Sequence, residues 1–230
     1  MLPYAGMTST HPHLPRPGES KTILIPGAAG HIESLVATPR THAASPGFAV
    51  VCHPHPLMGG ALTNKVAYTL ASCALKAGFH AVRFNFRGAG KSSGVHDEGR
   101  GETDDTVAVA EWMRGHLPGA ELLLMGFSFG AFVSIRAAAR AKPKLQVSVA
   151  PPFGKYFAGA ARPPRPPCPW LVIHSRDDDV VSYADTQSEL SHYDPPPELA
   201  TVDGAGHFFH GRLGDIQHAV QDFIARHWDR

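Results

Sequence analysis

The stretch around Ser128 constrains the fold of this chain more than any other. Four apolar residues at 122–125 run directly into Gly126-Phe127-Ser128-Phe129-Gly130, and an alanine-rich segment follows at 131–139. A short apolar run is typical of a buried strand, and the longer alanine-rich segment is typical of a helix. Glycine at 126 and 130 leaves no side chain to collide in a tight turn. The stretch therefore predicts a strand, a sharp turn and a helix, with Ser128 at the head of the helix.

The pattern G-x-S-x-G between a strand and a helix is the nucleophile elbow, in which a strained turn exposes a serine hydroxyl. The alternative is a serine that only caps the helix, since serine is common at that position and the pentapeptide also occurs by chance. Groups further along the chain have to decide between the two, because a serine hydroxyl needs a base to act as a nucleophile at neutral pH.

Composition excludes several classes of protein. The chain has 230 residues, 43% hydrophobic and 18% charged, and a net charge of +1. This balance indicates a globular protein and no nucleic-acid or membrane partner. The N-terminus has no apolar stretch typical of a secretory signal. Cys52, Cys73 and Cys168 are an odd number without C-x-x-C spacing, which favours reduced thiols and a cytoplasmic location.

The order of predicted elements indicates the architecture. Residues 1–20 are expected as a flexible leader and 21–230 as a single domain, which opens with a hairpin of strands at 21–26 and 31–37. From about residue 48 onward strands alternate with helices, which predicts a mostly parallel sheet with helices on both faces. Further strands are expected at 48–52, 80–86, 122–125, 145–150, 170–174 and 199–202, and helices at 64–77, 102–114, 183–193 and 213–228. Prolines argue against helix at 53–60, and the proline-rich segment 151–168 is expected as a loop or a minimal lid.

Two loops downstream of Ser128 carry the residues that a nucleophilic serine needs. The first follows an apolar run and contains three consecutive aspartates, Asp177, Asp178 and Asp179. The second contains His207 in a glycine-rich turn. Loops at the carboxyl ends of parallel strands meet at one edge of the sheet. The chain order Ser, Asp, His is the one expected for a nucleophile elbow.

These residues give the chain its resemblance to the α/β-hydrolase superfamily from about residue 21 onward. Residues 173–181 resemble the acid loop "I-H-G-x-x-D-x-V-V", with Ser175 in place of glycine. Aligning the final two valines implies that Asp178 is the triad carboxylate, with Asp177 and Asp179 as alternatives. The turn at 204–207 resembles the histidine loop of the superfamily, which implies that His207 is the base, with His210 as its local rival.

The oxyanion of an acyl-transfer reaction needs two N–H donors. The first is expected from Phe129, directly after the nucleophile. The resemblance implies a second donor in the loop after the strand expected at 48–52. In this loop His53-Pro54 replaces the more usual His-Gly. We expect His55 to supply it, with Leu57 as the next candidate because Pro56 has no N–H. Two histidines in a His-x-His spacing are too few for a metal site, and no metal or cofactor is expected.

The turn at 87–92 contains Gly-Lys-Ser, but Asn85 stands where a phosphate-binding loop needs its first glycine. It resembles instead the "R-G-x-G-x-S" turn after the fourth strand of α/β-hydrolases. We expect a structural role, with Arg87 paired to Glu102, Asp104 or Asp105. With the motifs at 53–66, 83–88, 101–105 and 126–130, the chain resembles a compact bacterial subgroup of esterases without a cap domain.

Several apolar residues on the loops near Ser128 suggest an acyl-binding wall, although each is more often a core residue. They are Leu57, Met58, Phe129, Phe153, Tyr156, Phe208 and Phe209. We therefore expect a serine hydrolase that cleaves a small carboxylic ester through an acyl-enzyme, by a Ser128-His207-Asp178 triad.

Other functions remain open at this point. They are a thioesterase, with Arg162 and Arg165 suited to the phosphates of an acyl-CoA, an amide or peptide hydrolase, and a non-catalytic binding protein on a hydrolase scaffold. The sequence also leaves a homodimer open.

Overall fold

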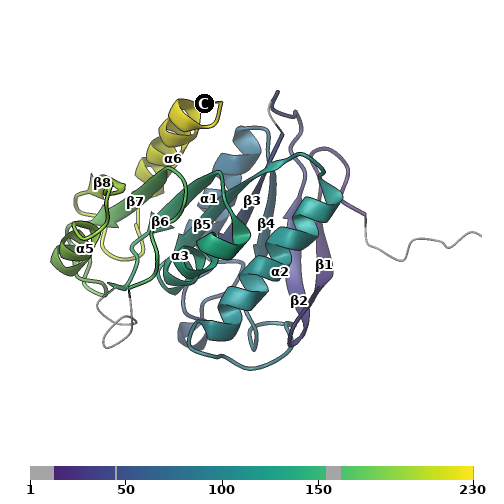
Figure 1. Ribbon diagram of the computed structural model, residues 1–230, viewed down its shortest axis with the longest axis horizontal. Coiled ribbons are helices and arrows are strands. Elements are labelled where there is room, and N and C mark those ends of the chain that lie inside the picture. Colours follow the sequence, from purple (N-terminus) through teal and green to yellow (C-terminus); the bar gives the residue numbers. More distant parts are fainter. Residues whose placement is uncertain (1–12, 45, 154–161, 230) are drawn as a thin grey trace, which may run out of the picture.

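The computed structural model describes residues 13–44, 46–153 and 162–229. Its described strands form one sheet in the order β1-β2-β4-β3-β5-β6-β7-β8 (Figure 1). The strands are β1 (Ser20–Gly27), β2 (Gly30–Ala37), β3 (Gly47–Cys52), β4 (His80–Phe84), β5 (Glu121–Phe127), β6 (Leu145–Val149), β7 (Trp170–Ser175) and β8 (Glu198–Val202). The helices are α1 (Lys65–Lys76), α2 (Arg100–His116), α3 (Phe129–Ala141), α5 (Tyr183–Leu190) and α6 (Leu213–His227).

The predicted hairpin and the predicted parallel sheet are both present. β1 and β2 pair antiparallel, and β2 pairs antiparallel with β4. From β4 to β8 all neighbouring strands are parallel. The carboxyl ends of β3, β5, β7 and β8 therefore lie at the same edge of the sheet, and so do the loops that follow them.

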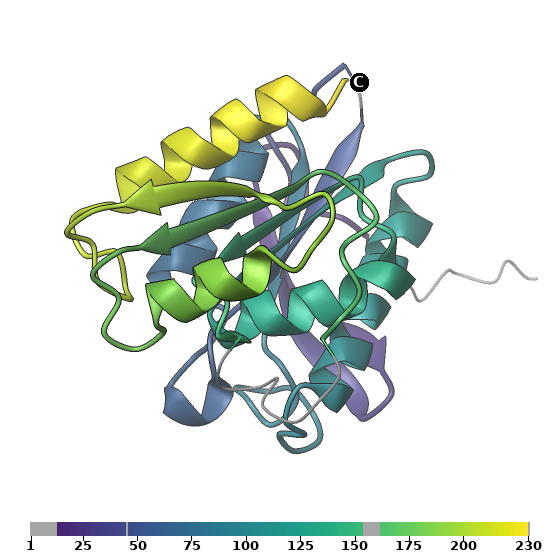
Figure 2. The ribbon, with the colours of Figure 1, turned by 60° about the vertical axis from the view of Figure 1, so that its left-hand side comes forward.

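Alternate residues of the central strands face opposite layers, as the pleat of a strand requires. In β5, Leu122 and Leu124 pack in the core cluster that includes residues of α2 and α3. Leu123 and Met125 pack in the cluster that includes α1 and α6. Figure 2 shows α6 (yellow) on one side of the sheet and α5 (light green) on the other. Because the central strands are buried on both faces, they read as continuous apolar runs in the sequence.

Several element ends differ from the expectation by one to three residues, among them that of β4, which ends at Phe84 and not at 86, and one short turn was not expected. Residues Pro56–Met58 form a 3-10 turn inside the segment where prolines argue against helix. Proline is tolerated there because it occupies the first turn, where its missing N–H has no partner to lose. The helix predicted at 183–193 ends at Leu190.

The expected leader is in part packed on the sheet. The hydroxyl of Thr38 donates to the carbonyl of Pro15 over 2.8 Å, and Leu14 packs against the α2 and α3 core. Residues 1–12 of that leader lie outside the described residues. Of the expected lid at 151–168, the described part includes Arg165, whose guanidinium donates to the backbone carbonyls of Pro166 and Cys168. The middle of that segment, 154–161, lies outside the described residues.

Backbone segments approach closely at the turn between β5 and α3. A Cβ on Gly126 would lie 2.2 Å from the carbonyl oxygen of Gly130, and a Cβ on Gly130 would lie 2.3 Å from that of Cys52. Real Cβ atoms do not come so close to backbone oxygens. Glycine at both positions is therefore required for β3, β5 and the start of α3 to meet, as the sequence predicted.

This contact predicts the effect of one added methyl group. Gly126→Ala is expected to lower the free energy of unfolding by about 1–3 kcal/mol or more, because backbone cannot yield as a flexible side chain does. Gly115→Ala is the matched control, since a Cβ at this position in α2 meets no heavy atom within 4 Å. It is expected to raise stability by about 0.5–1 kcal/mol. Urea denaturation measures both; a Gly126→Ala protein as stable as wild type would contradict the account of the turn.

Candidate active site

Ser128 lies in the turn between β5 and α3 with a backbone conformation that L-residues rarely adopt. Its φ is 53° and its ψ is −123°. The backbone N–H of Ser128 donates to the carbonyl of Val149 over 2.8 Å, and its own carbonyl accepts from Ala131 and Phe132 in the first turn of α3. These bonds hold the strained conformation, which costs of order 1–3 kcal/mol and is typical of functional positions. The side chain is largely buried, with 9% of the residue exposed.

Three side chains from distant parts of the sequence form a continuous hydrogen-bonded chain. His207 Nε2 lies 3.1 Å from Ser128 Oγ, and His207 Nδ1 lies 2.8 Å from Asp178 Oδ2. A carboxylate only accepts hydrogen bonds, so Nδ1 carries the hydrogen and Nε2 is left to accept the serine proton. This is the geometry that a serine nucleophile with a histidine base requires. The structure thus brings together the three residues that the sequence analysis assigns to the triad.

The surroundings of Asp178 distinguish it from its two neighbours. Its Oδ1 accepts the backbone N–H groups of Val180 and Val181 over 2.9 and 2.7 Å. Burial opposes ionisation of Asp178, but hydrogen bonds from His174, His207 and the Val181 N–H outweigh burial and hold the pKa of the carboxyl below its ordinary value. The carboxyl group is therefore charged throughout the neutral range.

The two alternative aspartates lie elsewhere. The carboxylate of Asp177 accepts the backbone N–H of Gly204, which ties it to the loop that carries His207. Asp179 is exposed. His210, the local rival of His207, is exposed as well and contacts the ring of Phe208.

A second histidine, for which no role was predicted from the sequence, contacts the same carboxylate. His174 Nε2 lies 3.2 Å from Asp178 Oδ2 and 3.1 Å from the carbonyl oxygen of Val181. Both are acceptors, so Nε2 carries the hydrogen. His174 is fully buried, and its Nδ1 has no hydrogen-bond partner in the described part of the chain. The histidine of the "I-H-G-x-x-D" resemblance was the signal available in the sequence, but it does not show that the ring contacts Asp178.

The loop after β3 lies beside the start of α3. The His55 ring lies 4.8 Å from that of Phe129, measured between centroids, and His55 lines the same cavity as Ser128. The N–H of Leu57, the alternative second donor, is directed to His55 Nδ1 over 3.2 Å. That bond turns Leu57 N–H toward the histidine ring and argues against it as an oxyanion donor.

His53 is a structural residue of the same loop. Phe86 N–H donates to its Nε2 over 3.0 Å, so Nδ1 carries the ring hydrogen and donates to the Pro54 carbonyl over 2.6 Å. Burial lowers the pKa of His53 to about 4. Both ring nitrogens are therefore engaged in fixing the loop, which leaves neither to hold a metal with His55.

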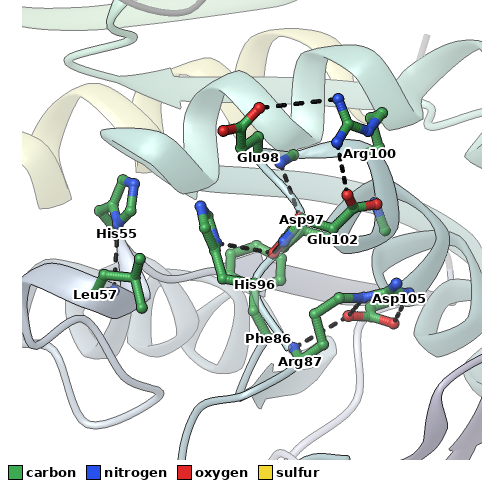
Figure 3. Close-up of polar contacts among 12 residues, drawn as sticks. His55, Leu57, Phe86, Arg87, His96, Asp97, Glu98, Arg100, Glu102 and Asp105 are labelled. Carbon is green, nitrogen blue, oxygen red and sulfur yellow. Dashed lines mark hydrogen bonds and ion pairs between the residues drawn. The ribbon is translucent and has the colours of Figure 1, made fainter. Parts of the chain in front are cut away.

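The loop before α2 carries His96, whose ring lies beside that of His55 (Figure 3). Glu102 is fully buried, accepts two backbone N–H groups of the preceding loop and lies 2.9 Å from His96 Nδ1. The ring of His96 in turn lies 4.7 Å from that of His55 and 5.4 Å from that of Phe129. The helix start thus braces the two residues expected to provide oxyanion donors.

Arg87 pairs with Asp105, one of the three acids expected for it. Its Nε and Nη2 bond the two carboxylate oxygens over 3.0 and 2.8 Å, and the Asp105 side chain is buried (Figure 3). This bidentate hydrogen bonding raises the pKa of Arg87. Asp104 is instead 2.6 Å from Arg140. The pair ties the turn after β4 to α2, a structural role.

A cavity of about 620 Å³ opens at Ser128. Leu57, Met58 and Phe208, which the sequence analysis expected in the pocket, line it together with His55 and a set of further residues: Pro54, Gly59, Gly60, Asn64, Ser128, Pro152, Val180, Val181 and His207. Leu57, Met58 and Phe208 are 71%, 84% and 50% exposed, so they form an apolar rim.

The expectation for Phe153 is wrong. Phe153 does not line this cavity but is buried, 1% exposed, in a cluster with Trp170 and Tyr193. Phe209 is fully buried in the core beside α6. Tyr156 lies outside the described residues.

Comparison with known proteins identifies the family of this chain. The family model described as X-Pro dipeptidyl-peptidase (S15 family) matches residues 9–155, and the protein RP471 of Rickettsia prowazekii is 31% identical over 211 residues, 86% of each chain. The chain belongs to the S15 family. The matched range of the S15 model includes Ser128 but ends before Asp178 and His207.

Two solved structures resemble this S15-family chain over nearly its whole length. XC6422 from Xanthomonas campestris, an α/β serine hydrolase without lid, is 37% identical with a TM-score of 0.84 over 94% of this chain and 97% of its own. An α/β serine hydrolase homologue from Coxiella burnetii is 37% identical with a TM-score of 0.82 over 90% and 97%. The fold class, a compact α/β-hydrolase without a large cap domain, is confirmed, and the chain is a serine hydrolase of this fold.

None of the helices in the described ranges is long and apolar enough to cross a membrane. The cytoplasmic location expected from the cysteines stays a prediction.

The His174 contact generates a prediction with a defined pH dependence. Because the pKa of Asp178 is depressed in the folded protein, its charge adds stability above the ordinary carboxyl pKa of about 3.9, and this stability is lost as the pH falls below that value. His174→Phe removes one donor, so the pKa of Asp178 rises toward its ordinary value. The variant is expected to have a lower free energy of unfolding than wild type at neutral pH. The difference between the two free energies is expected to become smaller below about pH 4.

Urea unfolding at a series of pH values measures this difference. The control is the same substitution in an Asp178→Asn background, where the difference is expected not to depend on pH in this range. A pH-dependent difference of equal size in both backgrounds would show that His174 does not act through Asp178.

Proposed function

We propose that this chain hydrolyses carboxylic esters through an acyl-enzyme formed on Ser128. The observation that carries the proposal is the hydrogen-bonded chain from Asp178 through His207 to Ser128 Oγ, at a cavity with a largely apolar rim. An activated serine attacks an acyl carbon, and an apolar wall binds the rest of the acyl group.

The geometry supports a two-step reaction. Ser128 Oγ attacks the ester carbonyl while His207 Nε2 takes its proton, and the C–O bond to the alcohol then breaks as His207 returns that proton to the leaving oxygen. Water, deprotonated by His207, attacks the acyl-enzyme, and the carboxylic acid leaves as Ser128 regains its proton. Asp178 keeps the imidazole in the required tautomer and stabilises it while it is positively charged.

The oxyanion of both steps is proposed to bind at the N-terminus of α3. Phe129 is the first residue of that helix, where backbone N–H groups point outward and the helix dipole favours negative charge. His55 N–H is proposed as the second donor, on the ground that its loop lines the cavity beside Ser128.

The thioesterase alternative is less well supported. Arg162 pairs with Glu189 over 3.0 Å and lies over the ring of Tyr193. The guanidinium of Arg165 donates to backbone carbonyls, including that of Pro195 over 2.7 Å. The two guanidinium groups that would suit an acyl-CoA phosphate thus already bind groups of the protein itself.

The family description makes an X-Pro dipeptidyl-peptidase the second candidate. An enzyme that removes dipeptides from the amino end of a peptide has to hold an ammonium group, which an acidic side chain does best. The described residues that line the cavity include no aspartate or glutamate. This favours a neutral ester over a peptide with a free amino end.

The first test is labelling with a fluorophosphonate probe, followed by peptide mapping. We expect the label on Ser128, no label in Ser128→Ala, and full labelling of the control Ser188→Ala, which removes a serine outside the cavity lining. Ester hydrolysis by Ser128→Ala is expected to fall by at least about 10⁴-fold, as when a triad nucleophile is removed. Folded protein that takes no label would favour the binding-protein alternative.

The substrate class is tested on a matched panel. Aryl esters of short fatty acids are expected to be hydrolysed with higher kcat/KM than the corresponding thioesters and than X-Pro anilides. Turnover of the X-Pro anilides with none of the esters would overturn the ester assignment in favour of the peptidase.

The apolar rim predicts a dependence on acyl length. Met58→Ser is expected to lower kcat/KM for an octanoate ester several-fold relative to an acetate ester, since one lost methylene contact is worth about 0.8 kcal/mol. Val95→Ser is the control, because Val95 is 77% exposed but does not line the cavity. Equal effects of the two substitutions on the octanoate-to-acetate ratio would argue that the acyl group does not lie against Met58.

A further inference from the structure

Asn64 is a polar side chain in the lining of the active-site cavity that the proposed reaction does not use. It precedes α1 as its N-cap and lines the cavity with Ser128 and His207. Among the described residues of the lining, the other side chains that can form strong hydrogen bonds are those of His55, Ser128 and His207. His55 Nδ1 already accepts the N–H of Leu57.

The hydrogen bonds of Asn64 identify which of its atoms is left over. Its backbone N–H donates to the carbonyl of Ala61 over 2.9 Å, and its carbonyl accepts from Tyr68 over 2.8 Å. The side-chain oxygen accepts the N–H groups of Val66 and Ala67 over 2.9 and 3.2 Å. Both N–H groups can only donate, so the oxygen of the amide has to face them and the amide cannot be flipped. In the described part of the chain, Nδ2 is the polar atom of Asn64 without such a bond.

The segment that carries Asn64 is held rigidly. Leu62 N–H donates to the side-chain oxygen of Asn85 over 2.8 Å, and Arg83 donates to the Leu62 carbonyl. Asn85 is fixed in turn by its side-chain N–H, which donates to Glu33 over 2.7 Å. A donor held in this way needs little reordering to bind a ligand, which is the property of a specificity contact.

We propose that Asn64 Nδ2 is a substrate-binding donor, which selects esters that carry an acceptor oxygen, such as a ketone, away from the scissile carbonyl. This deepens the proposed function and rests on it. The rim supplies apolar contact, and Asn64 supplies one directed hydrogen bond. An ester with a purely alkyl chain contacts the apolar rim but accepts no hydrogen bond from Asn64. Since such a substrate also excludes water, it leaves the Asn64 donor without a partner.

The test uses aryl esters of keto acids, with the ketone at increasing distance from the ester, each beside the alkyl ester of the same length. Wild type is expected to hydrolyse one keto ester with a kcat/KM about tenfold above that of its alkyl counterpart, the size typical of one directed hydrogen bond. Asn64→Asp keeps the capping oxygen and replaces the donor by an acceptor, and Asn64→Ser keeps a capping hydroxyl that is too short to reach. In both variants the keto-to-alkyl ratio is expected to fall to about one. Using a ratio removes any general effect of the new charge on His207.

Ser182→Ala is the matched control, because it removes the N-cap of α5, a helix that does not line the cavity. It is expected to lose stability in thermal unfolding but to keep the wild-type ratio. A wild-type protein that hydrolyses both series equally, or a ratio that persists in both Asn64 variants, would overturn the subsite and leave the ester assignment in place. Failure to hydrolyse either series would overturn the ester assignment and the subsite together.

Discussion

The close approach of three backbone segments at the end of β5 is the constraint on which the site depends. Gly126 and Gly130 allow the strand, the start of α3 and the end of β3 to meet without intervening side chains. Ser128 is held between them in a strained conformation by its bond to Val149. Because the strain is opposed by the packed core on both faces of the sheet, the serine cannot relax into an ordinary helix cap, and its hydroxyl stays at the carboxyl edge of the sheet.

The parallel sheet then brings the other groups to the same edge. The loop after β7 carries Asp178 and the loop after β8 carries His207, although 29 residues separate them and 79 separate His207 from Ser128. Asp178 is oriented by the backbone of its own loop and by His174, and the neighbouring Asp177 holds the loop of His207. Of the three consecutive aspartates, one thus faces the histidine and one positions the loop of the histidine, while Asp179 makes neither contact.

The elements and the residues at the ends of strands were predictable from the sequence, because apolar runs and glycine turns are local signals. Asp178 and His207 followed from the resemblance of their loops to those of α/β-hydrolases. Phe153 was misplaced because the sequence cannot say whether an aromatic residue after a strand faces solvent or packs against Trp170 and Tyr193. The directions of the N–H donors of His174 and Asn64 were also not predictable from the sequence. They are set by the neighbouring groups and not by residue type.

The most direct test of the central claim is a search for the covalent intermediate during turnover. The protein is mixed with an aryl ester, quenched in acid within the first turnover, and its intact mass and peptide masses are measured. The account predicts a gain equal to the acyl group, on the peptide that contains Ser128 and on no peptide of Ser128→Ala. Ester hydrolysis without acylation of Ser128, or acylation of another residue, would contradict it.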